Sequence, residues 1–306
     1  MIPPGRWTRL FFALPAIAAA QPAQPAFVPV EEKAALASPA IDETSGIAIS
    51  PVNPAFMWLI NDSGGTTDLF LAGDDGSDRG KIMLTGARNI DWEDLSAFVW
   101  QGKSYLLVAD TGDNNATRPF CTLHIVREPE LPAAGDRLAG TTAAAWKIDF
   151  RYEGGPRDCE AVAVDAAAGK IILISKRTKP PEIHELPLRP AKDAGVLVAT
   201  PVGHTRTKAP RKSLIPYRDQ PTGLDLSADG RLAAVVTYYG VFLFPRRPGE
   251  SWADAFSREP VGLGPHRLGQ AESVAFTQDA ATLFVVPEGR GAPILRLRKS
   301  AAAPAD

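Results

Sequence analysis

Histidine and cysteine are scarce in this chain of 306 residues. It has four histidines, none of them in H-x-x-x-H spacing, and two cysteines, which cannot complete a zinc site by themselves. We therefore expect no zinc chemistry. In an oxidising compartment Cys121 and Cys159 are free to form one disulfide. Two isolated buried thiols are an equally good interpretation, because two cysteines carry no spacing information.

The motifs of several large enzyme classes are also missing. The chain has no G-x-S-x-G nucleophile elbow and no phosphate-binding G-x-x-x-x-G-K-[ST] loop. Ser45 follows Glu43-Thr44, but no histidine occupies a matching position in the repeat described below. Serine-hydrolase and P-loop chemistry are therefore not expected.

Long helices are disfavoured as well. No stretch of 12 or more residues has a good 3.6-residue apolar period, and 28 prolines and 26 glycines are spread through the chain. Instead, apolar runs of four to eight residues alternate with Gly, Pro, Asp and Asn, which is typical of strands. The composition, 45% hydrophobic and 22% charged, suits one sizeable core. We predict an all-β chain with a single domain over residues 21–300.

Residues 1–20 have the pattern of a secretory signal peptide. Arg6 and Arg9 precede a short apolar run over Leu10–Ile17, and three alanines end the segment. An uncleaved anchor is the alternative, although the run is short for a membrane span. We expect a secreted or periplasmic monomer with a disordered tail over 301–306. Cleavage removes two arginines, which leaves 31 Lys+Arg against 35 Asp+Glu, a net charge of −4. Nucleic-acid partners are therefore not expected, nor is a membrane span after cleavage.

An internal repeat of about 50 residues gives the architecture. Five times, an apolar run begins beside a polar residue, and 16 or 17 positions later a second apolar run ends on another. The first members are Ser45, Glu93, Glu160, Thr222 and Glu272. The second members are Asp62, Asp110, Lys176, Tyr238 and Glu288. Short polar turns between the two runs predict a hairpin at the start of each repeat.

Further strands follow most of these hairpins, and radially repeated four-stranded units are the blades of a β-propeller. We predict five blades of mostly four antiparallel strands. Six blades are an alternative, because two of the gaps between repeats are long. The last blade lacks its outer strand, and 26–30 or 34–36, near the mature N-terminus, can supply it.

In this architecture the ten repeat residues converge on one mouth of the central channel. Crowded carboxylates need a cation or basic side chains for compensation. Oxygen ligands without histidine or cysteine favour Ca²⁺, with Mg²⁺ as the alternative. Turn capping by Asp and Asn is the competing interpretation for each residue taken singly. The candidate ligands are Glu43, Asp62, Glu93, Asp110, Glu160, Glu272 and Glu288.

Seven phrases of the chain, taken together, resemble a group of secreted, mostly uncharacterised bacterial β-propeller proteins. They cover about residues 40–290 and read ETSGIA, NDSGG, DWEDL, DTGDN, DCEAVAVD, PTGLDLSADG and QAESVAF. The resemblance implies a propeller fold and export. More distantly, DCEAVAVD and the strand ending at Lys176 are similar to phytase-like, esterase-like propellers, which use calcium and acidic channel residues on phosphate esters. The chain departs from these in its few basic residues. The chain also resembles calcium-containing propellers in which the axial ion is structural.

These patterns support two classes of function. The first is a binding module for a small molecule or a protein partner at a calcium-carrying channel mouth. The second is a calcium-dependent hydrolase of phosphate esters or lactones, with Glu160, Asp110 and Lys176 as candidate catalytic residues. A scaffold without metal, binding through its loops, is a third interpretation. Whether the protein is an enzyme is not determined by the sequence.

Overall fold

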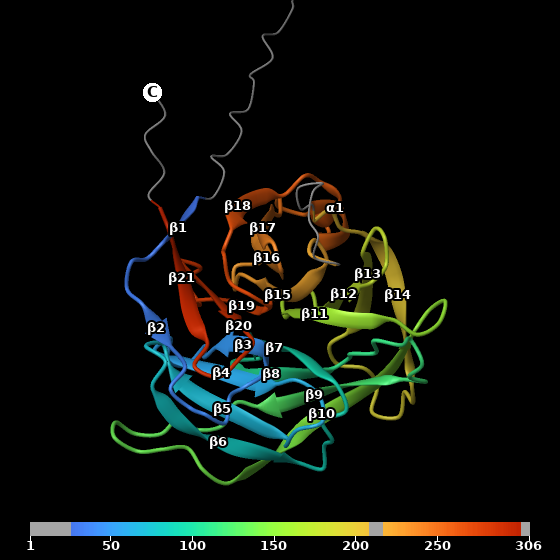
Figure 1. Cartoon of the computed structure of the whole chain (residues 1–306). Coiled ribbons are helices and arrows are strands. Elements are labelled where there is room, and N and C mark those ends of the chain that lie inside the picture. The colour runs from blue at the N-terminus through green and yellow to red at the C-terminus, as the bar shows by residue number, and fades with distance from the viewer. Residues whose placement is uncertain (1–25, 208–216, 301–306) are drawn as a thin grey trace, which may run out of the picture.

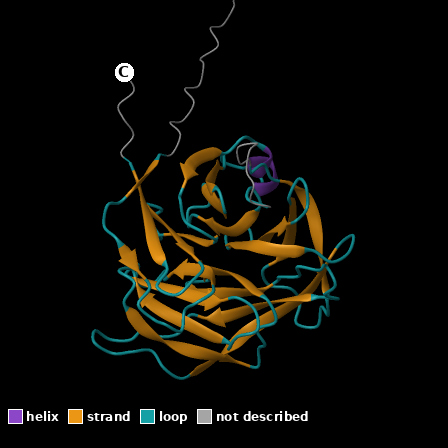
Figure 2. Ribbon diagram, viewed as in Figure 1, coloured by secondary structure: helices purple, strands orange, loops and turns teal. Residues whose placement is uncertain are grey.

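Strands make up nearly all the regular structure of the chain. The computed structural model describes residues 26–207 and 217–300, so the predicted signal segment 1–20 and tail 301–306 lie outside the described residues. Within these ranges there are 21 strands and one short helix (Figure 2). No helix in this part of the chain is long and apolar enough to cross a membrane. The prediction of an all-β chain is confirmed.

The strands form five consecutive four-stranded units. Unit 1 contains β3 (Thr44–Ile49), β4 (Phe56–Asn61), β5 (Asp68–Gly73) and β6 (Asp78–Thr85). Unit 2 contains β7 (Trp92–Trp100), β8 (Lys103–Asp110), β9 (Cys121–Arg127) and β10 (Thr141–Tyr152). Unit 3 contains β11 (Asp158–Asp165), β12 (Lys170–Lys176), β13 (Glu182–Pro187) and β14 (Leu197–His204). Unit 4 contains β15 (Pro221–Leu226), β16 (Leu232–Thr237), β17 (Gly240–Pro245) and β18 (Val261–Pro265). Neighbouring strands within each unit are antiparallel.

The fifth unit takes its outer strand from the N-terminal part of the chain. It contains β19 (Ala271–Phe276), β20 (Thr282–Pro287), β21 (Pro293–Lys299) and β1 (Phe27–Pro29). The short strand β2 (Ala34–Ala35) also pairs with β21. Both N-terminal segments expected to complete the last unit therefore pair with it, and they cover an edge that would otherwise be open.

The five units are arranged in a closed cycle. The first strands touch one another in the order β3, β7, β11, β15, β19 and back to β3. Figure 1 shows these strands near the centre and β6, β10, β14, β18 and β1 at the periphery. The apolar core is divided accordingly into five clusters, each packed between two successive units. Leu107 and Val162, for example, belong to the cluster between units 2 and 3. Strand β11 is buried along its whole length because it has neighbours on both faces.

The outer strand β10 links three units. It pairs antiparallel with β9, and its two ends pair in parallel with strands of the neighbouring units. Thr141–Ala143 lie beside β6 of unit 1, and Phe150–Tyr152 lie beside β14 of unit 3. Units 1, 2 and 3 therefore share one continuous sheet of 12 strands.

Two smaller features complete the fold. The helix α1 (Trp252–Ser257) was not expected from the sequence; the Ser251 hydroxyl caps it by accepting a hydrogen bond from the Asp254 amide at 3.1 Å. Cys121 and Cys159 are both buried free thiols, so the disulfide that the sequence permitted is not formed.

Candidate functional site

Each first strand carries a β-bulge at the residue that opens the repeat. The register of the first hairpin in every unit shifts by one residue near its start. A bulge leaves one residue unpaired and turns its side chain away from the regular alternation. The five residues passed over in these registers are Ser45, Glu93, Glu160, Thr222 and Glu272. The repeat found in the sequence is therefore a repeat of bulges.

The bulge side chains divide into two kinds. The Ser45 hydroxyl donates to the Trp92 carbonyl at 2.8 Å, and Thr222 donates to the Ala271 carbonyl at 2.8 Å, so both tie their unit to the next one. In units 2, 3 and 5 the residue is a buried glutamate. The three glutamates lie at the same end of the ring of first strands, together with the ends of the second strands.

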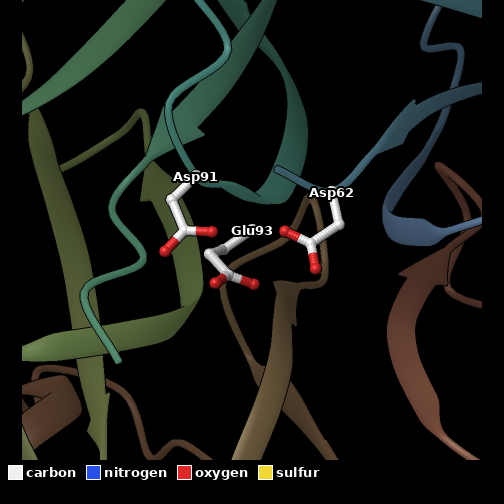
Figure 3. A group of neighbouring side chains, drawn as sticks. All are labelled: Asp62, Asp91 and Glu93. Atoms are coloured by element: carbon white, nitrogen blue, oxygen red, sulfur yellow. The ribbon is translucent and has the colours of Figure 1, made fainter. Parts of the chain in front are cut away.

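Asp62, Asp91 and Glu93 place their carboxylates against one another, as Figure 3 shows. One oxygen of each lies within 4.8 Å of the others. Asp62 follows β4 of unit 1, Asp91 immediately precedes β7, and Glu93 is the bulge residue of unit 2. The group is thus assembled across the boundary between two units.

A second group shares Glu93. It contains Glu93, Asp158 and Glu160, again with one oxygen of each within 4.8 Å of the others, and all three residues are buried. Glu93 is only 5% exposed, and burial together with the neighbouring carboxylates disfavours its charged form. A buried charge is costly unless a proton or a cation compensates it.

Crowding changes the acidity of the whole set. Burial, with the charges of Asp62 and Asp158, raises the pKa of Asp91 to about 7. Burial, with the charge of Glu160, raises the pKa of Glu93 well above its ordinary value. In Glu160 and Glu272 the same desolvation raises the pKa to about 8. Without a cation, part of this set therefore holds protons near neutral pH, while Glu160 has Lys176 as its counter-charge.

A chain of polar contacts continues from this point around the ring. The Lys176 ammonium forms a buried ion pair with Glu160 and lies 3.3 Å from the Tyr238 hydroxyl. Tyr238 donates to Glu272 at 2.5 Å. The Glu288 carboxyl in turn raises the pKa of Glu272 by hydrogen bonding to it. These contacts connect units 3, 4 and 5, and Lys176 supplies the positive charge among them.

Four of the seven predicted ligands lie outside these groups. Glu272 and Glu288 belong to the chain of contacts just described, and Asp110 and Glu43 have other partners. Asp110 is paired with Arg118 at 2.8 Å, with both side chains largely buried, and it accepts a hydrogen bond from the Asp91 amide at 3.2 Å. Glu43 is exposed, and its backbone carbonyl accepts a hydrogen bond from the Asp62 amide. Neither residue is a member of the two groups. Of the seven predicted ligands, Asp62, Glu93 and Glu160 are members.

Asp91 and Asp158 belong to the groups but are not among the ligands predicted from the sequence. Each stands two positions before a bulge glutamate, in Asp91-Trp92-Glu93 and Asp158-Cys159-Glu160. This D-x-E spacing was the available signal. The glutamate of each pair is the bulge residue, and the aspartate stands two positions before it.

The loop after β8 supports the first group without supplying a ligand of its own. Both oxygens of Asp113 accept backbone amides, from Thr117 and Arg118 at 2.8 Å each, so Asp113 caps the loop. Gly112 faces the carboxylates directly, because a Cβ at this position would lie 2.2 Å from Glu93 Oε1 and 2.4 Å from Asp91 Oδ2.

These residues fit a calcium ion. Calcium takes six to eight oxygens at about 2.4 Å, so oxygens on opposite sides of the ion are about 4.8 Å apart. Three carboxylates offer up to six oxygens, and the five residues of the two groups are all Asp or Glu, with no nitrogen or sulfur ligand. Comparison with models of protein families and with curated proteins gave no significant match to this chain.

Proposed function

We propose that the five units are the blades of a β-propeller that is exported and binds Ca²⁺ at one mouth of its channel. The protein then acts as a binding module for a small molecule or a protein partner at this mouth. Two features support the ring: the cyclic contact of the first strands and the completion of the last unit by β1. Export is supported by the sequence of residues 1–20. A mature N-terminus at Gln21 in exported protein would test it.

One observation carries the metal proposal. Asp62, Asp91 and Glu93 converge from two units with oxygens within 4.8 Å of one another, and Glu93 is buried between like charges. A cation at this place would replace the protons that the raised pKa values imply. Mg²⁺ would bind less well, because it demands stricter octahedral geometry and retains its waters.

The surroundings favour a ligand with an anionic group. Arg177 donates to Asp158 at 2.6 Å and its guanidinium lies over the exposed Tyr217 ring, 5.0 Å from the centroid. Together with Lys176 it places positive charge beside the second acidic group. An anion would meet this charge and a bound cation at the same time.

Calorimetric titration of chelator-treated protein with Ca²⁺ and with Mg²⁺ tests the metal site. We expect saturable Ca²⁺ binding that Glu93→Gln weakens at least tenfold, since it removes the charge shared by both groups. The matched control is Glu43→Gln, because Glu43 is exposed and outside the groups. Absence of Ca²⁺ binding, or equal losses in both variants, would contradict the proposal.

A hydrolase is the second candidate, and the Glu160–Lys176 pair favours it. Bound calcium would supply polarisation of a phosphoryl or carbonyl oxygen. Glu160, whose pKa burial raises to about 8, is placed to exchange a proton with water, and Lys176 is placed to stabilise negative charge. Asp110, the remaining catalytic candidate, would act by holding Arg118 and the Asp91 backbone.

A panel of phosphate monoesters, diesters and lactones, assayed with Ca²⁺, separates the two functions. A hydrolase would turn over one member, and Glu160→Gln would abolish turnover while the variant remains folded. A binding module would show no turnover with any of them, and the same variant would lose only metal affinity or stability.

A further inference from the structure

A cavity lies at the opposite end of the first strands from the acidic groups. All five units contribute to it through the last residues of their first strands and the turns that follow. Its volume is about 150 Å³. A cavity of this size accommodates a molecule about as large as benzene.

Asp94 lies between the cavity and the acidic groups. Its carboxylate accepts backbone amides from Val162 at 2.8 Å and from Leu224 at 3.1 Å, and it also accepts the Leu95 amide at 2.8 Å. These amides lie on β7, β11 and β15, between the bulges and the lining of the cavity. The cavity is therefore a pocket separate from the acidic groups.

Apolar side chains form about half of the pocket wall. Ala48, Ala97, Phe98, Val164 and Phe276 line it. Such a surface favours a ligand with a hydrocarbon body, since each buried methylene contributes roughly 0.8 kcal/mol. Among the described residues, the carboxylates of this lining do not come close enough together to form a group that could hold a metal ion.

Asp225 gives the pocket an unneutralised charge. It accepts the Phe276 amide at 2.7 Å, and burial raises its pKa to about 7. No cationic side chain pairs with it among the described residues. A carboxylate has about four acceptor positions, so these hydrogen bonds leave room for another donor.

The other charges of the pocket are already partnered. Asp165 is held by Arg246 at 2.8 Å and by the Trp252 indole at 2.9 Å. Asp229 lies exposed at the rim and accepts hydrogen bonds from Ser227 and from the Arg231 amide. The balance of lining charges, three carboxylates against one guanidinium, is negative.

We propose that this pocket binds a small organic cation of the alkylammonium class. The ammonium group donates to Asp225, and the alkyl chain packs against the apolar wall. This inference does not depend on calcium or on the acidic groups, so the two proposals fail independently.

The probe is n-butylammonium, compared with 1-butanol and butyrate, by saturation-transfer NMR and calorimetry at pH 8.5, where Asp225 is ionised. We expect saturable binding of the amine with a Kd on the order of 1 mM, given five non-hydrogen atoms. The alcohol should bind at least tenfold more weakly, and butyrate should not bind.

Two variants locate the site. Asp225→Asn should weaken amine binding at least tenfold while retaining an acceptor for the Phe276 amide. Ala97→Leu should block binding by filling the pocket with Asp225 intact, which covers the case in which Asp225→Asn fails to fold. Asp136→Asn, which alters an exposed carboxylate of the β9–β10 loop, is the control and should bind normally. Absent binding, equal binding of butanol, or unchanged affinity in both pocket variants would overturn the proposal.

Discussion

The Asp94 carboxylate accepts a hydrogen bond from the amide of Leu224 at 3.1 Å, although the two residues are 130 positions apart. The same oxygen accepts the Val162 amide. One fully buried side chain on unit 2 therefore holds strands of units 3 and 4 across the centre of the ring. Burial raises the pKa of Asp94 well above its ordinary value, which is the cost of this arrangement.

We predict that Asp94→Ala destabilises the protein by about 3 kcal/mol or more, because three buried amides lose their acceptor. Asp94→Asn should cost less, since it keeps one oxygen. Urea unfolding of both variants measures the difference. Equal stability of Asp94→Ala and the wild type would show that the contact does not hold the ring.

Gly112 provides a test of the first acidic group that leaves every carboxylate in place. Gly112→Ala puts a methyl group where Glu93 Oε1 and Asp91 Oδ2 now lie, so both side chains must move. We expect Ca²⁺ affinity to fall at least tenfold with a small change in melting temperature. The control is Gly65→Ala, where the nearest atom to an added Cβ is 3.9 Å away. Similar affinities in the two variants would count against the site.

Lys176 balances the second group. The Lys176 and Glu160 side chains are 5% and 6% exposed, and removal of one partner from a buried pair costs roughly 3–5 kcal/mol. We predict this loss for Lys176→Met at pH 9, measured by urea unfolding with EGTA. At pH 6 the loss should be smaller, because Glu160, with its raised pKa, can then bind a proton. A loss independent of pH would exclude this explanation.

Asp225 should leave a signature in the pH dependence of stability. Its pKa is about 7 in the folded chain and near 4 when unfolded, so between these values the unfolded chain binds fewer protons. Its contribution to stability therefore falls as pH rises from 4 to 7 and is constant above about 8. Asp225→Asn removes this pH-dependent contribution, so the stability of the variant relative to the wild type should rise between pH 4 and pH 7. If the free energies of unfolding of the wild type and Asp225→Asn differed by the same amount at every pH, the raised pKa of Asp225 would be contradicted.

The cysteines should be unreactive in the folded protein. Burial raises the pKa of Cys121 and of Cys159 to about 12. We expect a thiol reagent at pH 8 to label neither residue without denaturant and both in guanidinium chloride. Labelling of fewer than two thiols after unfolding would show that they had been oxidised.

The hairpins and most outer strands could be predicted because their signals are local. Polar turns such as Ser227–Gly230 separate two apolar runs, and β9 (Cys121–Arg127) is one of the further strands expected after the hairpins. The pairing of the N-terminal strand β1 with β21 could be predicted because the last unit lacks an outer strand of its own. The number of blades and their closure into a propeller remain part of the proposal above.

The geometry of the candidate site depends on contacts that the sequence does not encode locally. Sequence reasoning placed Asp110 at the mouth from its repeat position, but its pairing with Arg118 depends on the fold of the loop between them. It missed Asp91 because this residue is not a repeat position and precedes β7, and its approach to Asp62 depends on how units 1 and 2 pack. The bulges, and the role of Asp94, appear only once strands of different units are in register.

Because of the long strand β10, neighbouring units are not held together equally around the ring. This strand joins the outer strands of units 1, 2 and 3 in one sheet. In the described part of the chain, by contrast, the outer strand β18 pairs only with β17, and β1 pairs only with β21. Fluctuations that part neighbouring units should therefore begin on the side of units 4 and 5. Tyr238 of unit 4 donates a hydrogen bond to Glu272 of unit 5 across this boundary. Separation of units 4 and 5 would therefore widen the acidic end of the ring on this side, while the side formed by units 1, 2 and 3 stays rigid.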